Sequence, residues 1–479
     1  MVFMRFMVQA VGVVAVCALP AVMTTRLDAQ TVPGMTATSA ANLAGRPPAA
    51  QQSPLQKLVD RAESGALIEV TAGEYVGDLF IDRSVRLVGK GRPRLLGSGA
   101  GSVVLVRADD VTIEGFEIDG RAGGSVDADA AGIHVAAKRV VIRDCHIVRS
   151  LFGIYLREAD GATVVDTTVD GNRDLEPGDQ GSGIHLWNTQ GFTLRGNRIH
   201  DSRDGFYLQN SAHGRVTHNI VSDVRYGLHY MYSDNNVFED NTFERSAAGA
   251  ALMYSKHLVF RRNRFVHNRG FASVGLLMQG CDDVIAEDNL IDDNARGIFI
   301  EGTHRDVFRR NVIANADVAL VIYDSVAQCR FEGNAFVGNL SPLQLVGRRT
   351  DTVFEGNYWS DDTSADVDGD GIRDEPYRVS SVFDHLRGNL TAADLFAQGL
   401  AADVLARAER TFPVLEPVSV ADARPLARPP VLVDVPAAMP GSGTSGAPWA
   451  AAGCGLAMAG GLAVLFLGRR RPSFAAVPS

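Results

Sequence analysis

Residues 183–252 carry one four-residue motif in four successive copies: Gly183-Ile184-His185-Leu186, Gly205-Phe206-Tyr207-Leu208, Gly227-Leu228-His229-Tyr230 and Gly249-Ala250-Ala251-Leu252. The copies begin 22 residues apart, and after an insertion of four residues the step resumes at Gly275, Gly297 and Ala319. A column of asparagines keeps the same period: Asn197, Asn219, Asn241, Asn263, Asn289, Asn311, Asn334 and Asn357. Two markers that share one period predict a repeat protein.

The repeats have the pattern of short β-strands. Apolar and polar residues alternate within them, as in residues 237–243, and Gly or Asn stands at the corners. Such segments suit a parallel β-helix, in which each strand pairs with its equivalent in the next coil about 4.8 Å away. We therefore expect an all-β, right-handed parallel β-helix over residues 54–390. A leucine-rich horseshoe is the alternative for this period, but it requires a ladder of leucines.

The cysteines fit the same scheme. Cys145 falls at the position that the asparagines take in later coils, so we expect a buried thiol rather than a reactive one. Cys281 and Cys329 occupy different columns, which predicts no disulfide between them.

Composition limits the class of partner. The 479 residues include 56 acidic and 46 basic ones, a formal net charge of −10, so a nucleic-acid partner is not expected. With 46% hydrophobic and 21% charged residues, the chain can bury a large core.

The two ends have the composition of targeting segments. Residues 1–29 have the basic start and apolar middle of a signal peptide, and residues 30–53 form a flexible lead-in. Residues 391–448 are expected to form a helix and a Pro-rich stalk. Residues 449–468 are apolar and precede a basic tail, residues 469–479, which predicts a transmembrane segment with a cytoplasmic tail. A removable C-terminal sorting signal would have the same layout.

Alternation along the Gly-led strands predicts an outer strip of functional residues. If Leu228 and Tyr230 point inward, then His229 and Met231 point outward, and Met253 lies about 4.8 Å from Met231 on the next coil. Imidazole and thioether groups together favour Cu(I), so His229, Met231 and Met253 are the candidate copper ligands.

Other residues of this region are the candidate partner face: His185, Trp187, Tyr207 and Tyr232. A docking face for protein or sugar, without any metal, is the alternative for all of these residues.

An acidic loop follows the last repeat. Asp366, Asp368, Asp370 and Asp374 stand at positions 1, 3, 5 and 9 of a calcium-like loop, with Gly at position 6. Position 12 holds Tyr377 in place of the usual glutamate, so a calcium site and a bare Asp/Gly turn are both open.

A polysaccharide-cleaving enzyme is the rival class of function. Such an enzyme needs paired carboxylates, and Asp282-Asp283 is a pair, with Asp201, Asp204 and Asp223 on nearby coils. However, aspartates are common at turns for conformational reasons alone. The chain also lacks a Gly-x-Ser-x-Gly nucleophile elbow, and we expect no catalysis.

Two stretches resemble the NosD family of periplasmic maturation proteins of nitrous oxide reductase. They are residues 227–233 (Gly-Leu-His-Tyr-Met-Tyr-Ser) and residues 356–361 (Gly-Asn-Tyr-Trp-Ser-Asp), the second followed by the acidic loop and Glu375-Pro376-Tyr377. The resemblance covers about residues 54–390, whose shorter repeats are shared with carbohydrate-binding and sugar-hydrolase-like β-helices.

The resemblance implies a function and a set of partners. It implies a β-helix that assists copper-centre assembly without catalysing a reaction. The implied partners are apo nitrous oxide reductase, the membrane subunit of an ABC transporter and a copper chaperone lipoprotein. Residues 449–468 depart from the soluble pattern of this family, so we expect a periplasmic protein anchored to the inner membrane.

Overall fold

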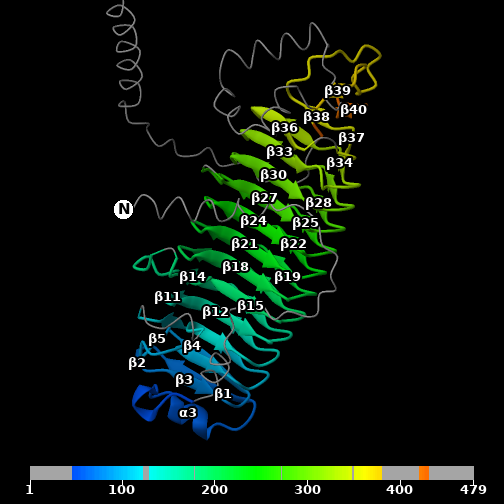
Figure 1. Cartoon of the computed structure of the whole chain (residues 1–479). Coiled ribbons are helices and arrows are strands. Elements are labelled where there is room, and N and C mark those ends of the chain that lie inside the picture. Colours follow the sequence, from blue (N-terminus) through cyan, green and yellow to red (C-terminus); the bar gives the residue numbers. More distant parts are fainter. Residues whose placement is uncertain are drawn as a thin grey trace, which may run out of the picture.

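The computed structural model describes residues 46–121, 129–176, 178–270, 272–347, 350–379 and 420–430, which form one elongated solenoid (Figure 1). From β1 to β38, successive strands enter three sheets in rotation, so every third strand joins the same sheet, and β39 and β40 are both added to the first sheet. These sheets, called sheets 1, 2 and 3, contain 15, 13 and 12 strands. Strands of neighbouring coils pair in parallel; Val237 of β22 (Val237–Glu239), for example, pairs with Val259 of β25 (Val259–Arg261). The predicted all-β, right-handed parallel β-helix is confirmed.

The strands are short and regular in all three sheets. Sheet 1 contains β1 (Ala66–Thr71), β4 (Val85–Lys90), β7 (Thr112–Glu114), β10 (Val141–Arg143), β13 (Thr163–Val165), β16 (Thr193–Arg195), β19 (Arg215–Thr217), β22, β25, β28 (Ile285–Glu287), β31 (Val307–Arg309), β34 (Arg330–Glu332), β37 (Val353–Glu355), β39 (Tyr377–Arg378) and β40 (Ala421–Asp422). Sheet 2 contains β2 (Glu74–Val76), β5 (Arg94–Leu96), β8 (Glu117–Asp119), β11 (His146–Val148), β14 (Thr168–Asp170), β17 (Arg198–His200), β20 (Ile220–Ser222), β23 (Thr242–Glu244), β26 (Arg264–Val266), β29 (Leu290–Asp292), β32 (Val312–Ala314), β35 (Ala335–Val337) and β38 (Tyr358–Trp359). Sheet 3 contains β3 (Leu79–Ile81), β6 (Val104–Val106), β9 (Ala131–Val135), β12 (Phe152–Arg157), β15 (Ile184–Trp187), β18 (Asp204–Gln209), β21 (Tyr226–Met231), β24 (Ala248–Met253), β27 (Val274–Gln279), β30 (Arg296–Glu301), β33 (Val318–Tyr323) and β36 (Ser341–Val346).

The glycine marker has a steric cause. A Cβ atom on Gly227 would lie 2.5 Å from the carbonyl oxygen of Gly249 and 2.8 Å from the ring of Phe243. The next coil and the neighbouring sheet therefore approach too closely there for any side chain. Glycine recurs because this close approach recurs in each coil.

The asparagine marker forms a continuous hydrogen-bonded column inside the solenoid. Asn263, which is fully buried, donates from Nδ2 to the carbonyl oxygen of Phe238 (2.9 Å) and to Oδ1 of Asn289 (3.1 Å). Its own Oδ1 accepts from the backbone N–H of Asn241 at 3.1 Å. Each asparagine thereby supplies hydrogen-bond partners to backbone N–H and C=O groups at a corner, where the strands do not pair with one another. Cys145 lies in this column, 2% exposed, as expected.

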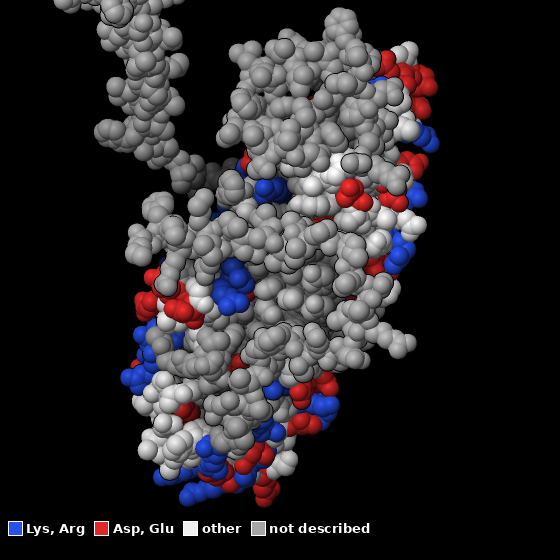
Figure 2. Space-filling model, viewed as in Figure 1, with Lys and Arg blue, Asp and Glu red and all other residues white. Residues whose placement is uncertain are grey.

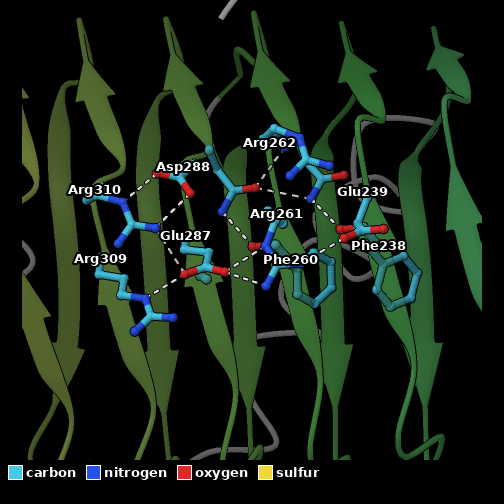
Figure 3. A network of polar contacts seen from close by, with 12 residues as sticks. Phe238, Glu239, Phe260, Arg261, Arg262, Glu287, Asp288, Arg309 and Arg310 are labelled. Atoms are coloured by element: carbon cyan, nitrogen blue, oxygen red, sulfur yellow. Dashed lines mark hydrogen bonds and ion pairs between the residues drawn. The ribbon is translucent and has the colours of Figure 1, made fainter. Parts of the chain in front are cut away.

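Alternating charges link the coils on the outside of sheet 1 (Figure 3). Glu287, 3% exposed, accepts from Arg261 (2.6 Å), Arg309 (2.5 Å) and Arg310 (3.1 Å), and Arg261 also donates to Glu239 (2.9 Å). Opposite charges thus alternate along the column and neutralise one another. Figure 2 likewise shows basic and acidic side chains intermingled along the visible edges.

A short helix starts the described solenoid, and a distant segment closes it. Helix α3 (Gln56–Arg61) follows the 3-10 turn η2 (Ala49–Gln51) and precedes β1. At the other end, Asp422 of β40 accepts from the backbone N–H and Nδ2 of Asn357 (2.8 and 2.9 Å), ending the asparagine column. We expected this part of the chain to lie in the stalk, but residues 420–430 pack against the last coils instead.

The expected signal peptide (residues 1–29), transmembrane segment (residues 449–468) and cytoplasmic tail (residues 469–479) all lie outside the described residues. Among the described residues, no helix has the length and apolar character needed to cross a membrane.

Candidate functional site

The outer strip lies on sheet 3 in two adjacent columns. Strand pairing aligns His185, Tyr207 and His229 in the first column. The second column contains Trp187, Gln209, Met231 and Met253, in that order. Leu228 and Tyr230 between them are fully buried, so alternation orients the side chains as the sequence indicated. The structure therefore brings the three candidate copper ligands onto two neighbouring coils.

The first column is a ladder of alternating histidine and tyrosine rings. It runs from His134 through Tyr155, His185 and Tyr207 to His229, with centroid separations of 5.0, 4.5, 4.3 and 4.6 Å. The first four rings are stacked, whereas His229 meets Tyr207 edge-on at 78°. Stacked rings cover each other's faces, and sugars bind to exposed aromatic faces. The ladder consequently presents edges and polar atoms rather than a sugar platform.

Two histidines of the ladder are uncharged at neutral pH. Burial lowers the pKa of His134 to about 4 and that of His185 to about 3. Nδ1 of His185 is buried and has no hydrogen-bond partner, although the residue as a whole is only half-buried. His185 therefore acts as an apolar spacer in the stack, while His229, with 13% of its side chain exposed, is the last ring of the ladder.

His229 is held by an aspartate that sequence reasoning did not assign to the strip. Asp204, fully buried, accepts from Nδ1 of His229 at 3.1 Å and from Nε and Nη2 of Arg225 at 2.8 and 2.7 Å. Burial alone would raise the pKa of Asp204, but the hydrogen bonds from His229 and Arg225 outweigh it and lower the pKa to about 2. Two-residue alternation would place Asp204 inward with Phe206, but its carboxylate contacts His229 and Arg225 instead.

The two methionines lie between the polar group of His229, Asp204 and Arg225 and an apolar patch on the next coils. Sδ of Met231 lies 4.0 Å from the hydroxyl oxygen of Tyr207, and Met253 packs against Ala248, Ala251 and Val274. Met231 and Met253 are direct partners in the strand pairing. Two thioethers and one imidazole on adjacent coils form a soft donor set of the kind that suits Cu(I).

An open cavity of about 1120 Å³ lies beside the polar end of the strip. Arg203, Arg225 and Tyr226 line it on the solenoid side, and residues 173–176 line it on the other. Tyr226, whose ring centroid is 5.2 Å from that of His229, is among the lining residues, so the cavity opens next to the strip.

The candidate partner-face residues differ in accessibility. Tyr232 is 53% exposed and stacks on Tyr254 at 5.3 Å, and both tyrosines have positive φ angles (49° and 51°). Equivalent residues of neighbouring coils, Asn188, Asn210 and Gly280, are also left-handed, so this backbone conformation belongs to the repeated corner. The exposure of the stacked tyrosine pair is what makes it available to a partner. Trp187 is partly covered by the guanidinium of Arg157, 4.7 Å from the ring centroid, and His185 and Tyr207 lie within the ladder.

The acidic loop brings three of its four aspartates together. Ligand atoms of Asp366, Asp368 and Asp370 lie within 4.8 Å of one another; among the described residues, no other three histidine, cysteine or acidic groups meet this criterion. Asp374 instead accepts from the backbone N–H of Val367 at 2.8 Å. The loop has the oxygen donors that calcium prefers, and the same carboxylates also cap turns.

Both members of the acidic pair of the rival enzyme class are held by basic side chains. Asp282 contacts Lys256 (3.2 Å) and His304 (2.9 Å), and Asp283 accepts from Arg305 at 2.7 and 2.8 Å. Arg305 lowers the pKa of Asp283. Burial would raise the pKa of Asp282, but the hydrogen bonds from His304 and Lys256 outweigh it and lower the pKa. A general acid needs a raised pKa, so this pair does not fit that role.

Comparison with known proteins places these features in a family. A family profile described as "Periplasmic copper-binding protein (NosD)" matches residues 165–368. The chain is 36% identical to the "Probable ABC transporter binding protein NosD" of Pseudomonas aeruginosa over 396 residues, covering 80% of this chain and 92% of the relative. It is 34% identical to the protein of the same name from Stutzerimonas stutzeri, covering 75% and 86% of the two chains.

A solved structure shares the fold alone. The A-module of a mannuronan C-5 epimerase from Azotobacter vinelandii superimposes with a TM-score of 0.54 at 16% identity, covering 63% of this chain and 94% of the module. At this identity the epimerase chemistry does not transfer. The sequence relatives, which span most of both chains, are decisive: the chain belongs to the NosD family of periplasmic copper-binding proteins.

Proposed function

We propose that this protein is a periplasmic accessory factor for maturation of nitrous oxide reductase, in which the outer strip handles Cu(I) during assembly of the copper centres. The observation that carries the proposal is the in-register pair Met231 and Met253 beside His229. The family's description as copper-binding supports it, and the cation-paired acidic residues favour a non-catalytic role.

A competition titration tests the copper role directly. The full chain is titrated with Cu(I) against a chromophoric chelator, alongside the Met231→Ala/Met253→Ala variant. A matched control is Gln279→Ala/Glu301→Ala, because these residues continue the same column on the next two coils. We expect stoichiometric binding by the unmodified protein and the control, and loss of binding in the methionine variant. Unchanged Cu(I) binding by that variant would place the copper site elsewhere. Absence of Cu(I) binding by every form would refute the proposed copper role.

The partners follow from the same proposal. Apo nitrous oxide reductase receives the copper, a copper chaperone lipoprotein supplies it, and the ABC transporter membrane subunit holds the complex at the inner membrane. The relatives' name, "ABC transporter binding protein", supports the transporter contact. Exposed Tyr232 and half-buried Trp187 beside the strip are the proposed contact face. Tyr232→Ala is expected to weaken co-purification with the transporter subunit while leaving Cu(I) binding intact.

Membrane attachment is proposed through residues 449–468, after removal of the signal peptide at residues 1–29. Retention of the protein in membranes after alkaline extraction, and its release on truncation before residue 449, would support this. Full release of the intact chain by alkali would contradict it.

A metal-free docking scaffold and a glycan-binding β-helix are the competing functions. Both predict that neither the unmodified protein nor the methionine variant binds Cu(I). The first predicts partner binding without copper, and the second predicts measurable affinity for acidic polysaccharide such as alginate.

A further inference from the structure

Asp204 holds His229 in a way that matters for a metal site. Resting on the proposed copper role, we infer that Asp204 is its positioning residue: it fixes the His229 tautomer that carries a proton on Nδ1 and leaves Nε2 free to bind the ion. No signal in the sequence repeat marks Asp204 for this role.

The hydrogen-bond geometry determines the tautomer. An ionised carboxylate can only accept, so the 3.1 Å contact between Asp204 Oδ2 and His229 Nδ1 requires a proton on Nδ1. Arg225 also approaches Nδ1, but at 3.4 Å, and its Nη2 atom lies much closer to Asp204, at 2.7 Å. A neutral His229 therefore has its lone pair on Nε2, the nitrogen that Asp204 does not contact.

The surrounding rings hold the imidazole in this orientation. Tyr207 and Tyr226 pack edge-on against His229 from two sides, with centroids at 4.6 and 5.2 Å and interplanar angles of 78° and 86°. Arg225 in turn lies over the ring of Tyr226 at 4.4 Å. Carboxylate, guanidinium and both tyrosines thus pre-orient one imidazole. Such outer contacts are typical of histidines that bind metals.

Asp204 differs from Asp223 and Asp293, two other aspartates of this solenoid that pair with arginine, in being fully buried. Asp293 also accepts from an arginine and a histidine, Arg269 and His267, each at 2.8 Å, but its side chain is 39% exposed. Asp223 and Arg245 form a similar two-bond pair between successive coils, at 3.1 and 2.9 Å. Asp223, however, lies at a corner with φ of 57°, its side chain is 45% exposed, and no histidine hydrogen bond to it is found among the described residues. The solenoid therefore uses such pairs as inter-coil braces, and at Asp204 the brace is buried and holds a histidine.

The test compares two carboxylates that each pair with an arginine of the next coil, of which Asp204 contacts His229 and Asp223 does not. Asp204→Asn and Asp223→Asn are each made in the full chain, and Cu(I) affinity is measured by chelator competition. We expect Asp204→Asn to bind Cu(I) about ten- to a hundred-fold more weakly, the range found for lost outer-shell partners. Asp223→Asn should bind within about two-fold of the unmodified protein, because it removes a brace without touching His229.

A second readout separates positioning from folding. In the metal-free chain labelled with ¹⁵N-histidine, the shifts of His229 should show a protonated Nδ1 and an unprotonated Nε2, and this preference should be lost in Asp204→Asn. Because the amide oxygen of an asparagine side chain can itself accept a hydrogen bond from Nδ1, Asp204→Leu provides a further variant that cannot accept one.

The outcomes for this inference and for the proposed function differ. Unchanged Cu(I) affinity in both Asp204 variants, or a His229 protonated on Nε2 in the unmodified protein, would overturn the inference and leave the copper role standing. Absence of Cu(I) binding by the unmodified protein would overturn the copper role and the inference with it.

Discussion

Asp306 is a buried carboxyl group whose replacement should stabilise the protein. It is 0% exposed, and its Oδ1 accepts from the backbone N–H of Val284 at 2.8 Å, whereas Oδ2 is buried without a partner. Asn236 makes the equivalent bond to Gly214, also 22 residues earlier, and its Nδ2 additionally donates to the carbonyl oxygen of Ser211 at 2.8 Å. An asparagine at position 306 could therefore keep the bond to Val284 and add a donor where Oδ2 has no partner.

The pH dependence of the free energy of unfolding gives the size of the stabilisation expected from replacing Asp306. Burial, together with the nearby charges of Asp282 and Asp283, raises the pKa of Asp306 from 3.8 to about 7. Near pH 3 the folded and unfolded states are both protonated, so the group has no effect. As the pH rises from about 4 to 7, only the unfolded state releases the proton, so the folded state loses stability. At about 1.4 kcal/mol per pKa unit, the loss above pH 7 is on the order of 4 kcal/mol.

Asp306→Asn removes this titration and introduces an amide donor like that of Asn236. Urea unfolding, followed by the fluorescence of buried Trp359, should show the variant more stable than the unmodified protein by roughly 4 kcal/mol at about pH 8 and nearly equal to it at about pH 4. Asp223→Asn is the control of opposite sign, because Arg245 lowers the pKa of Asp223 and its carboxylate stabilises the fold at neutral pH. A stability difference for Asp306→Asn that does not grow with pH, or a loss at pH 8, would refute the reasoning.

Three further perturbations test other parts of the structure. Asn263→Ala should lower the free energy of unfolding by about 3–5 kcal/mol, because the carbonyl oxygen of Phe238 and the backbone N–H of Asn241 both lose a buried hydrogen-bond partner. Urea unfolding measures this loss, and a value below about 1 kcal/mol would contradict a stabilising role of the asparagine column. Glu287→Gln should lower the free energy of unfolding by about 1–3 kcal/mol, because three arginines lose their shared carboxylate. Glu355→Gln, at an exposed site, is the control and should lower it less in the same urea assay. If residues 366–370 bind calcium, added Ca²⁺ should raise the melting temperature and Asp368→Ala should abolish the rise; an unchanged melting temperature would indicate a bare turn.

The sequence by itself determined the solenoid and the membership of the outer strip. Gly227 and Asn263 recur every 22 residues because each coil meets the same close approach and the same unsatisfied corner. Once that period is known, two-residue alternation decides which side chains face outward. Met231 and Met253 could therefore be paired across coils without coordinates, since identical coils stack in register.

The tertiary structure alone decided how the strip is held and how the solenoid ends. Asp204 meets His229 through a one-coil offset and a choice of rotamer, and the sequence period contains neither. Asp422 closes the asparagine column at Asn357, 65 residues earlier, from a segment that reads as a linker. Periodicity predicts contacts between equivalent positions of neighbouring coils. Contacts between inequivalent positions depend on side-chain conformation and on where the chain returns, and only the folded molecule fixes these.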